Sequence, residues 1–278
     1  MEIISKTIRA NFGDEIHVYF LGDMHEGNCN HAEKELLKAV DIIKNDDKAY
    51  WIGMGDFIEA ITHTGDPRFN PLELSLKYSL KDLKDLPRKQ IEHIYQKLDP
   101  IREKCVALLC GNHEEQYIKR NSFDVYDYLA SFFPDKELKL GYVGFLKFGI
   151  NRQPEKDRPN LTYVIALNHG TGGGGYREGY PINKVHDQFR WFDADISIMG
   201  HLHVLYEDSK IFTGVTNTNK IKESKRCWGI SGCFLKTFIC GNTNYFEHKG
   251  KSASDIGMLR ATIKVGQEKN CKLDKIFL

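Results

Sequence analysis

Short apolar runs recur along the chain, and each ends in glycine or polar residues. Five of them have the length and composition of buried strands, at residues 16–21, 49–54, 105–110, 161–167 and 196–199. Between the first two, Leu36, Val40 and Ile43 recur at helical spacing and predict an amphipathic helix over 31–45. A strand, a helix and a strand in this order form a βαβ unit, which favours parallel pairing of the two strands.

The remaining pattern predicts a helical insertion and a β-rich end. Apolar residues at helical spacing predict two helices, over 72–83 and 87–103, whose register is broken at Pro87. This insertion, near 70–103, is placed where it would cap the strand ends. Two further helices and one further strand are expected, over 122–132, 181–192 and 142–149. Residues 203–278 are rich in Thr, Gly, aromatic and β-branched residues and predict more strands, so we expect a single domain over 1–278.

Composition narrows the class of protein. The net charge of +1 disfavours a protein that only binds nucleic acid electrostatically. No signal peptide is visible at the start, and no apolar run approaches the ~20 residues of a membrane helix, so no membrane association is expected. The seven cysteines form no CxxC pair, which favours free thiols in a reducing cytoplasm. We therefore expect a cytoplasmic enzyme or binding protein.

The predicted strand ends carry a set of metal-ligating side chains. In chain order these are Asp23 and His25, Asp56, Asn112 and His113, His169, and finally His201 and His203. Each alone is explained by a turn or a surface histidine, but their recurrence after apolar runs favours a metal site. Carboxylate, imidazole and amide oxygen suit divalent ions such as Mn²⁺, Fe²⁺ and Zn²⁺. So many ligands predict two ions, roughly 3.5–4 Å apart and bridged by a carboxylate.

The order of these blocks resembles a known family. Asp-x-His at 23–25, Gly-Asp at 55–56, Gly-Asn-His-Glu at 111–114, His169 and Gly-His-x-His at 200–203 resemble the calcineurin-like metallophosphoesterase superfamily. The resemblance covers about residues 1–205. It implies an α/β fold, namely a metallophosphoesterase-type β-sandwich of two mixed sheets flanked by helices, with 203–278 supplying strands of the second sheet.

The resemblance also implies roles for individual residues. Asp23, His25 and His203 would hold the first metal, Asp56 would bridge, and Asn112, His169 and His201 would hold the second. His113 would lie beside the centre without binding a metal. Mn²⁺ is the first expectation, with Fe, Zn or Ni as alternatives. The family usually has Asp or Asn where this chain has Glu59, and we expect altered support of the ligands there.

These groups together predict phosphoester hydrolysis. Two cations bind the anionic oxygens of the ester, and a water held between them loses its proton and attacks phosphorus in line. The leaving alkoxide needs a proton, and His113, next to ligand Asn112, is the candidate donor. A surface histidine is the alternative interpretation of His113.

Two segments are candidates for substrate contact. The run Gly172–Gly175 follows His169 directly and leads to Arg177, which could reach a phosphate, although a flexible connection explains it equally well. The second is a basic run, 220–226, beside Trp228. It is compatible with single-stranded nucleic acid, but a charged loop is the simpler interpretation.

The leading prediction is a dimetal-dependent phosphoester hydrolase, a phosphodiesterase acting on a nucleotide or nucleic acid. A phosphomonoesterase is the main alternative within the enzyme class. From a different class, the chain could be a non-catalytic scaffold, as a retromer subunit of this fold is. Scaffolds of that kind lose a catalytic histidine, whereas every block is complete here. The sequence leaves the substrate, the metal pair and the oligomeric state open.

Overall fold

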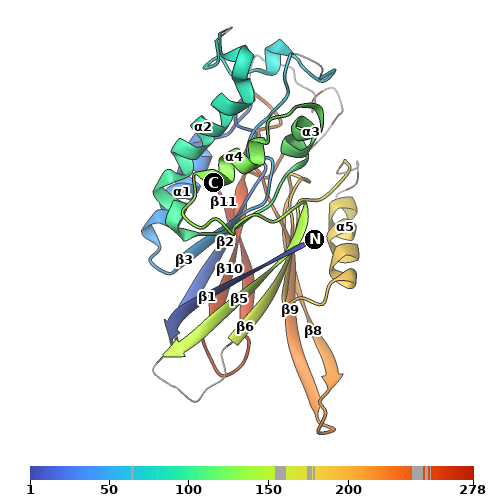
Figure 1. Ribbon diagram of the computed structural model, residues 1–278. Coiled ribbons are helices and arrows are strands. Elements are labelled where there is room, and N and C mark those ends of the chain that lie inside the picture. Colours follow the sequence, from blue (N-terminus) through green and yellow to red (C-terminus); the bar gives the residue numbers. More distant parts are fainter. Residues whose placement is uncertain are drawn as a thin grey trace.

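Two mixed β-sheets lie face to face, and helices cover the outer face of each (Figure 1). The predicted fold class, an α/β sandwich of two mixed sheets flanked by helices, is confirmed. The computed structural model describes the chain over residues 1–63, 66–79, 81–153, 161–173, 177, 179–239, 247, 250 and 252–278.

The five-stranded sheet contains the predicted βαβ unit. Its strand order is β11-β10-β2-β3-β4. Its strands and their first connecting helix are β2 (Glu15–Leu21), α1 (Glu33–Asn45), β3 (Ala49–Gly53), β4 (Cys105–Leu108), β10 (Gly257–Lys264) and β11 (Cys271–Phe277). β2, β3 and β4 run parallel, so their carboxyl ends meet at one edge. β10 and β11 pair antiparallel beside them.

The six-stranded sheet has the order β1-β5-β6-β7-β9-β8. Its strands are β1 (Glu2–Asn11), β5 (Val143–Gln153), β6 (Leu161–Asn168), β7 (Ile196–Met199), β8 (Leu205–Val215) and β9 (Ile221–Ser231). β6 and β7 are parallel, which brings their carboxyl ends to the same edge. The strands expected after residue 203 are present, as β8 to β11. β1 was not predicted, because most of its side chains are exposed and its apolar alternation is weak.

Three hydrophobic clusters hold the layers together. The space between the sheets is filled by side chains such as Phe20, Phe148 and Tyr163. α1, α2 (Leu86–Leu98) and α4 (Val125–Ser131) pack around Trp51 on the outer face of the five-stranded sheet. α5 (Gly179–Trp191) covers the other sheet around Trp228. Burying one such side chain stabilises the fold by ~1.5–3 kcal/mol, so these clusters fix the strand ends.

The helical insertion is only half helical. The predicted helix over 72–83 does not form in its described residues, which make short 3₁₀ turns at Pro71–Glu73 and Asp82–Asp85, while Leu80 lies outside the described residues. Leu76 is fully exposed, at 101%. Pro87 does not separate two helices. It sits in the first turn of α2, where its missing N–H costs nothing.

The helix expected over 122–132 is also revised. α4 is shorter and begins after Asp124, whose side chain accepts from the Asp127 N–H. Before it lies α3 (Asn112–Arg120), which was missed. Its signal was present in the sequence, because Glu114 follows just after the start and Arg120 closes the helix, in line with the helix dipole. Asn112 and His113 therefore stand in the first turn of a helix.

The basic run beside Trp228 is neither a loop nor a stacking surface. From Ile221 it forms β9, paired antiparallel with β8. Trp228 is 2% exposed and lies 4.4 Å from Phe189, ring centre to ring centre. A buried indole cannot stack on a nucleic-acid base, so the single-strand interpretation of this run is wrong.

The described cysteines are free thiols: Cys29, Cys105, Cys110, Cys227, Cys233 and Cys271. Cys240 lies outside the described residues. Among the helices of the described part of the chain, none has the length and hydropathy to cross a membrane.

Candidate metal centre

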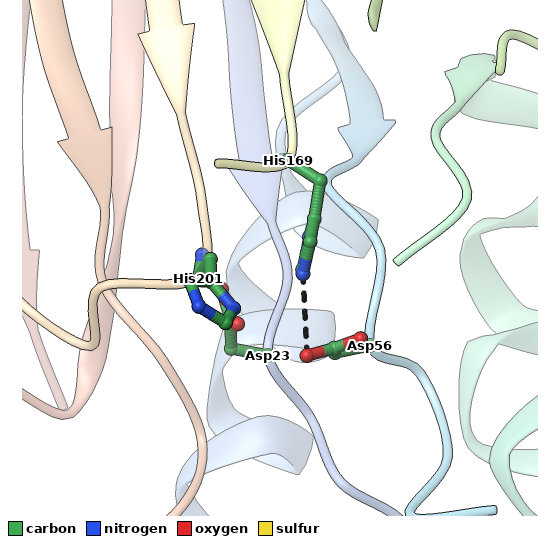
Figure 2. Close-up of side chains that lie close together, drawn as sticks. All are labelled: Asp23, Asp56, His169 and His201. Carbon is green, nitrogen blue, oxygen red and sulfur yellow. Dashed lines mark hydrogen bonds and ion pairs between the residues drawn. The ribbon is translucent and has the colours of Figure 1, made fainter. Parts of the chain in front are cut away.

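The predicted ligands converge at one edge of the sandwich. Loops after β2, β3 and β4 bring Asp23, His25, Asp56 and Asn112 from the five-stranded sheet, and loops after β6 and β7 bring His169, His201 and His203 from the other. Figure 2 shows four of these side chains pointing toward one another. Both sheets therefore contribute to a single cluster.

One group consists of Asp23, His25 and His203, whose ligand atoms lie within 4.8 Å of one another. His203 Nε2 is 3.5 Å from Asp23 Oδ1, and His25 Nε2 is 3.3 Å from His203 Nε2. This is the set predicted for the first metal.

A second group contains Asp23, Asp56, His169 and His201. Asp56 Oδ2 lies 3.2 Å from His169 Nε2 (dashed in Figure 2) and 3.8 Å from His25 Nε2. Asp56 thus reaches both groups, as a bridging carboxylate must. Asp23 also belongs to both groups, which the sequence-based assignment to the first metal did not anticipate.

One buried polar atom shows that this cluster fits cations. Asp23 Oδ1 is buried and has no hydrogen-bond donor among the described residues. The side-chain amide of Asn112 lies at the same place, 3.0 Å from His169 Nε2. Buried polar atoms are normally satisfied, and a carboxylate oxygen that lies unpaired among imidazoles can be satisfied by a metal ion. The residues present therefore fit a metal centre.

The imidazoles are oriented by their second nitrogen. His169 Nδ1 donates to the Met54 carbonyl at 2.7 Å, and His201 Nε2 donates to the Gly172 carbonyl at 2.9 Å. Since a carbonyl can only accept, the opposite nitrogen of each ring faces the cluster and is the one that a metal ion would take. Partners of this kind fix the tautomer of metal-binding histidines.

Glu59 supports two histidines at once. Its Oε2 accepts from His25 Nδ1 at 3.0 Å, and its backbone carbonyl accepts from His113 Nδ1 at 2.5 Å. The rings of His25 and His113 meet edge to face, with centroids 4.6 Å apart. Glu59 thus supports the predicted ligand His25 through its side chain and His113 through its backbone carbonyl.

The backbone at the ligands is left-handed. Positive φ angles occur at Asp23 (51°), His25 (49°), Asp56 (50°), His201 (67°) and His203 (56°). Such angles are uncommon outside glycine and cluster at functional sites. They turn the chain sharply after each strand, so that both members of Asp-x-His and of His-x-His enter the cluster.

Gly111 lets two of these loops touch. A Cβ at this position would lie 2.1 Å from the Asp56 nitrogen and 2.2 Å from its Oδ1. Any larger residue would push the β4 loop away from the predicted bridging ligand.

Buried charge dominates the electrostatics. Burial lowers the pKa of His169, but the carboxylates of Asp56 and Asp23 outweigh it and raise that pKa to about 10. Burial and the charge of His169 lower the pKa of His201 to about 4. The two carboxylates therefore demand positive charge at this point, and divalent ions would meet that demand.

Glu114 is a supporting residue that sequence reasoning missed. It is fully buried, and its carboxylate accepts from three backbone N–H groups, those of Asp56 (3.0 Å), Ile58 (3.1 Å) and Gly111 (2.9 Å). It ties the loop after β3 to the start of α3. Its position beside His113 in the sequence could have suggested a capping role.

The remaining predicted residues lie as follows. His113 is beside the cluster, and its N–H donates to Asp56 Oδ1 at 2.9 Å. Arg177 is exposed, and its carbonyl accepts from the Tyr180 N–H at 2.9 Å. Gly174 and Gly175 lie outside the described residues. The contact of Arg177 with a substrate phosphate stays a prediction.

The sandwich and its cluster define a metallophosphoesterase-type protein. Residues 16–205 match the family described as calcineurin-like phosphoesterase, and the chain belongs to this family. The family is dimetal-dependent, which agrees with the two groups that contain Asp23, among four candidate groups in the described part of the chain. None of the curated proteins compared with the chain matches it.

Several solved structures are similar to this chain at low identity. A metallophosphoesterase from Sphaerobacter thermophilus is 13% identical, with 94% of this chain and 88% of that chain covered and a TM-score of 0.37. Vps29 from Chaetomium thermophilum is 8% identical, with 94% and 95% covered and a TM-score of 0.39. The NAD nucleotidase of Haemophilus influenzae is 10% identical, with 95% and 50% covered and a TM-score of 0.39. None of these likenesses carries an argument about activity.

Proposed function

We propose that the chain is a phosphodiesterase that uses two divalent metal ions to hydrolyse a nucleotide or nucleic-acid ester. The observation that carries this proposal is the convergence of carboxylate and imidazole side chains from both sheets in two adjoining groups of candidate ligands. The free thiols of the described cysteines agree with a cytoplasmic substrate. The absence of a thiolate from the ligand set favours Mn²⁺, with Fe, Zn or Ni as alternatives.

Each ligand has a place in this proposal. Asp23, His25 and His203 would hold one ion, Asn112, His169 and His201 the other, and Asp56 would bridge. When bound, such ions neutralise the phosphate oxygens and lower the pKa of a water molecule so that it can act as nucleophile. The chain's contribution is to hold the ligands fixed, through Glu59, Glu114 and the backbone carbonyls that orient the imidazoles.

His113 is the proposed proton donor to the leaving group. Its Nδ1 donates to the Glu59 carbonyl, so its Nε2 is the nitrogen available to the substrate. The main-chain bond to Asp56 holds the residue beside the bridging carboxylate. It touches the predicted bridging ligand and stays outside the ligand set, which suits a group that moves a proton.

Arg177 is proposed as a second substrate contact. It follows a glycine-rich loop whose Gly172 carbonyl bonds His201, so the loop starts at the cluster. Arg177→Ala should raise KM while leaving metal content unchanged, and Arg177→Lys should restore part of the loss, because lysine keeps the charge but not the fork. Turnover like that of the parent in both variants would show that the loop is only a connection.

A substrate panel tests the proposal. The protein is stripped with chelator, loaded with Mn²⁺, and assayed on bis-aryl and mono-aryl phosphates and on single- and double-stranded DNA and RNA. We expect two ions per chain and faster hydrolysis of diesters than of monoesters. Faster hydrolysis of monoesters would favour the phosphomonoesterase. If no ester is hydrolysed with Mn²⁺, the panel is repeated with Fe²⁺, Zn²⁺ and Ni²⁺, and no hydrolysis with any of the four metals would favour the scaffold.

Asp56→Asn is the decisive variant. A neutral amide no longer holds two cations together, so this variant should lose one or both ions and its hydrolysis. Asp47→Asn, which removes an acid at an exposed position, is the matched control and should behave as the parent. Full metal content in Asp56→Asn would contradict the bridging role.

A further inference from the structure

Two arginines, Arg68 and Arg120, form ion pairs with the carboxylate of Asp66, which lies in the loop between β3 and α2. Arg68 Nε and Nη2 donate to Asp66 Oδ1 and Oδ2 at 3.1 and 2.8 Å. Arg120, the last residue of α3, places Nη1 2.7 Å from Asp66 Oδ2. Two guanidinium groups thus share a single carboxylate, which leaves one positive charge in excess.

The pair faces solvent, and its carboxylate does not. The side chains of Arg68 and Arg120 are 38% and 41% exposed, whereas that of Asp66 is 7% exposed. Asp66 anchors both guanidinium groups through its carboxylate. Among the residues described by the structure, which exclude Thr64 and Gly65, Arg68 Nη1 has no hydrogen-bond partner. A fixed guanidinium with an open edge is suited to bind an anion.

Arg68 lies next to the metal centre, on the side of His113. It lines a small cavity together with Glu59, the residue whose carboxylate bonds His25 and whose carbonyl bonds His113. The pKa of Arg68 is raised by its bonds to Asp66, and also by the charges of Glu59 and Asp56, so its guanidinium is within electrostatic reach of the centre. The proposed function needs only His113 on this side, and these arginines have no part in it.

We infer that Arg68 and Arg120, fixed on Asp66, form a subsite for a second phosphate that the substrate carries on its leaving-group side. This inference rests on the proposed function, because His113 marks the side from which the leaving group is protonated. It names the substrate class as nucleotide diesters with a phosphate next to the scissile one. Oligonucleotides have this chemistry, and simple aryl esters do not.

A purely structural pair makes a different prediction. If Asp66 only ties the loop to α3, removing either arginine weakens the fold and affects all substrates alike. If the arginines bind phosphate, the loss is confined to substrates that carry the second phosphate. The two roles are therefore separated by comparing substrates within each variant.

The test compares thymidylyl-thymidine with and without a terminal phosphate, at either end, together with a bis-aryl phosphate. In the parent, one phosphorylated form should have the higher kcat/KM. Arg68→Gln and Arg120→Gln should lower kcat/KM for that form by roughly 10–100-fold, the usual effect of removing a charged hydrogen bond. Hydrolysis of the bis-aryl ester should change by less than about twofold, since it has no second phosphate.

The matched control is Lys119→Gln, which removes a cation from the same turn of α3. Lys119 is 66% exposed and pairs with Glu115, so no loss of preference is expected. Binding of thymidine 3′,5′-bisphosphate and of thymidine 5′-monophosphate is measured by calorimetry in the Mn²⁺-loaded protein. The bisphosphate should bind more tightly, and Arg68→Gln should abolish the difference.

The outcomes separate the inference from the function. Equal losses for all substrates, or no preference for the second phosphate in the parent, would overturn the subsite. If the parent hydrolyses no ester but binds the bisphosphate through Arg68, the subsite stands and the proposed hydrolysis fails. If the parent hydrolyses diesters but shows no preference for the second phosphate, the proposed hydrolysis stands and the subsite fails.

Discussion

At the scale of single residues, main-chain bonds hold the left-handed ligands in place. Asp23 N–H donates to the Gly55 carbonyl at 2.9 Å, and His25 N–H donates to the Asp56 carbonyl at 3.0 Å. A residue in this conformation persists only where its surroundings determine it. The loop after β2 and the loop after β3, which carries the predicted bridge Asp56, therefore fix each other. The ligands are positioned before any cation arrives.

Glu114 makes this arrangement testable. Glu114→Gln leaves one oxygen to accept where a carboxylate accepted from three N–H groups, and it turns an amide donor toward them. We expect Mn²⁺ affinity to fall by roughly 10–100-fold and the free energy of unfolding to fall by about 1–3 kcal/mol. Calorimetric titration and urea denaturation measure the two quantities.

The control for Glu114 is its neighbour. Glu115→Gln changes a side chain that is 42% exposed and pairs with Lys119 on the surface. Exposed pairs of this kind contribute little, so neither quantity should change measurably. If Glu114→Gln kept the parent's metal affinity while losing stability, its role would be confined to the fold.

If His113 is the proton donor, the rate lost on removing it should depend on the leaving group of the ester. His113→Ala should keep both metals and lose roughly 10²–10⁴-fold in rate on esters with alkoxide leaving groups. The loss should shrink for nitrophenolate, which leaves without a proton. Rates for a series of aryl and alkyl esters, with metal content measured alongside, would show this trend. An equal loss across the series would assign His113 another role.

The sequence predicts the candidate metal ligands more readily than the residues that hold those ligands in position. Asp23, His25 and Asp56 could be predicted because each directly follows an apolar run beside a glycine, so that the signal is local. Two of the three donors to Glu114, the N–H groups of Asp56 and Ile58, come from another loop, and Arg120 meets Asp66 across about fifty positions of the chain. Such contacts exist only once the loops are packed, and no local pattern records them.

At the scale of elements, a buried charge network joins α2 to the loop after β2. Glu26 is fully buried and pairs with Lys77 and with Lys97 of α2, the latter at 2.6 Å. Tyr78 donates to the same carboxylate at 2.9 Å. Burial would raise the pKa of Glu26, but His31 and the lysines lower it to about 2. The insertion is thus fixed by charge to the segment that carries Asp23 and His25.

His31 gives this network a pH dependence. Its Nδ1 donates to the Met24 carbonyl, and its Nε2 faces Lys97 at 3.1 Å and Glu26 at 3.3 Å, with Lys77 and Glu33 also nearby. Burial lowers its pKa to about 4. Between pH 6.5 and 4 the unfolded chain therefore binds a proton that the folded chain does not, and stability falls as pH falls.

The size of this effect can be measured. His31 should remove at most about 3 kcal/mol from the free energy of unfolding between pH 7 and pH 4. In His31→Gln, which keeps a donor and an acceptor but cannot titrate, the decline over this window should be smaller by that amount. Urea denaturation at successive pH values gives both curves. His63→Gln, at an exposed position, is the control, and parallel curves for the parent and His31→Gln would contradict the prediction.

Elements with strong internal pattern were predictable, and those defined by their contacts were not. α1 has its buried apolar residues at helical spacing, and β2, β3 and β7 are short, mostly apolar runs. The stretch 72–83 has leucines at helical spacing, but Leu72 and Leu76 are exposed, at 75% and 101%, so these leucines form no buried helical face. α3 is short and polar, and its place is fixed by Glu114 and the strand ends beneath it. Apolar residues at helical spacing predict a buried helix only where the fold provides a surface for that helix to pack against.

At the scale of the whole molecule, the predicted ligands span the sandwich. Asp23, His25, Asp56 and Asn112 follow strands of one sheet, while His169, His201 and His203 follow strands of the other. The sheets are joined elsewhere by the hydrophobic side chains between them. Ions bound at this edge would tie both sheets together by charge. Unfolding or separation of the sheets would then require their release, because no such cluster exists in an unfolded chain.

Metal loading should therefore raise the thermal stability of the entire chain in one transition. At a Mn²⁺ concentration of 100 times Kd, binding to the folded state adds about 2.7 kcal/mol, which corresponds to roughly 5–10 °C in Tm for a domain of this size. Differential scanning calorimetry of chelator-stripped and loaded protein measures the shift, and Asp47→Asn should show it in full. Asp56→Asn should lose most of it, since the two halves of the cluster are no longer bridged. If the metal raised only the stability of a local transition, the sandwich would not be clamped by its metal centre. If Asp56→Asn kept the full shift, metal binding would not depend on the predicted bridge.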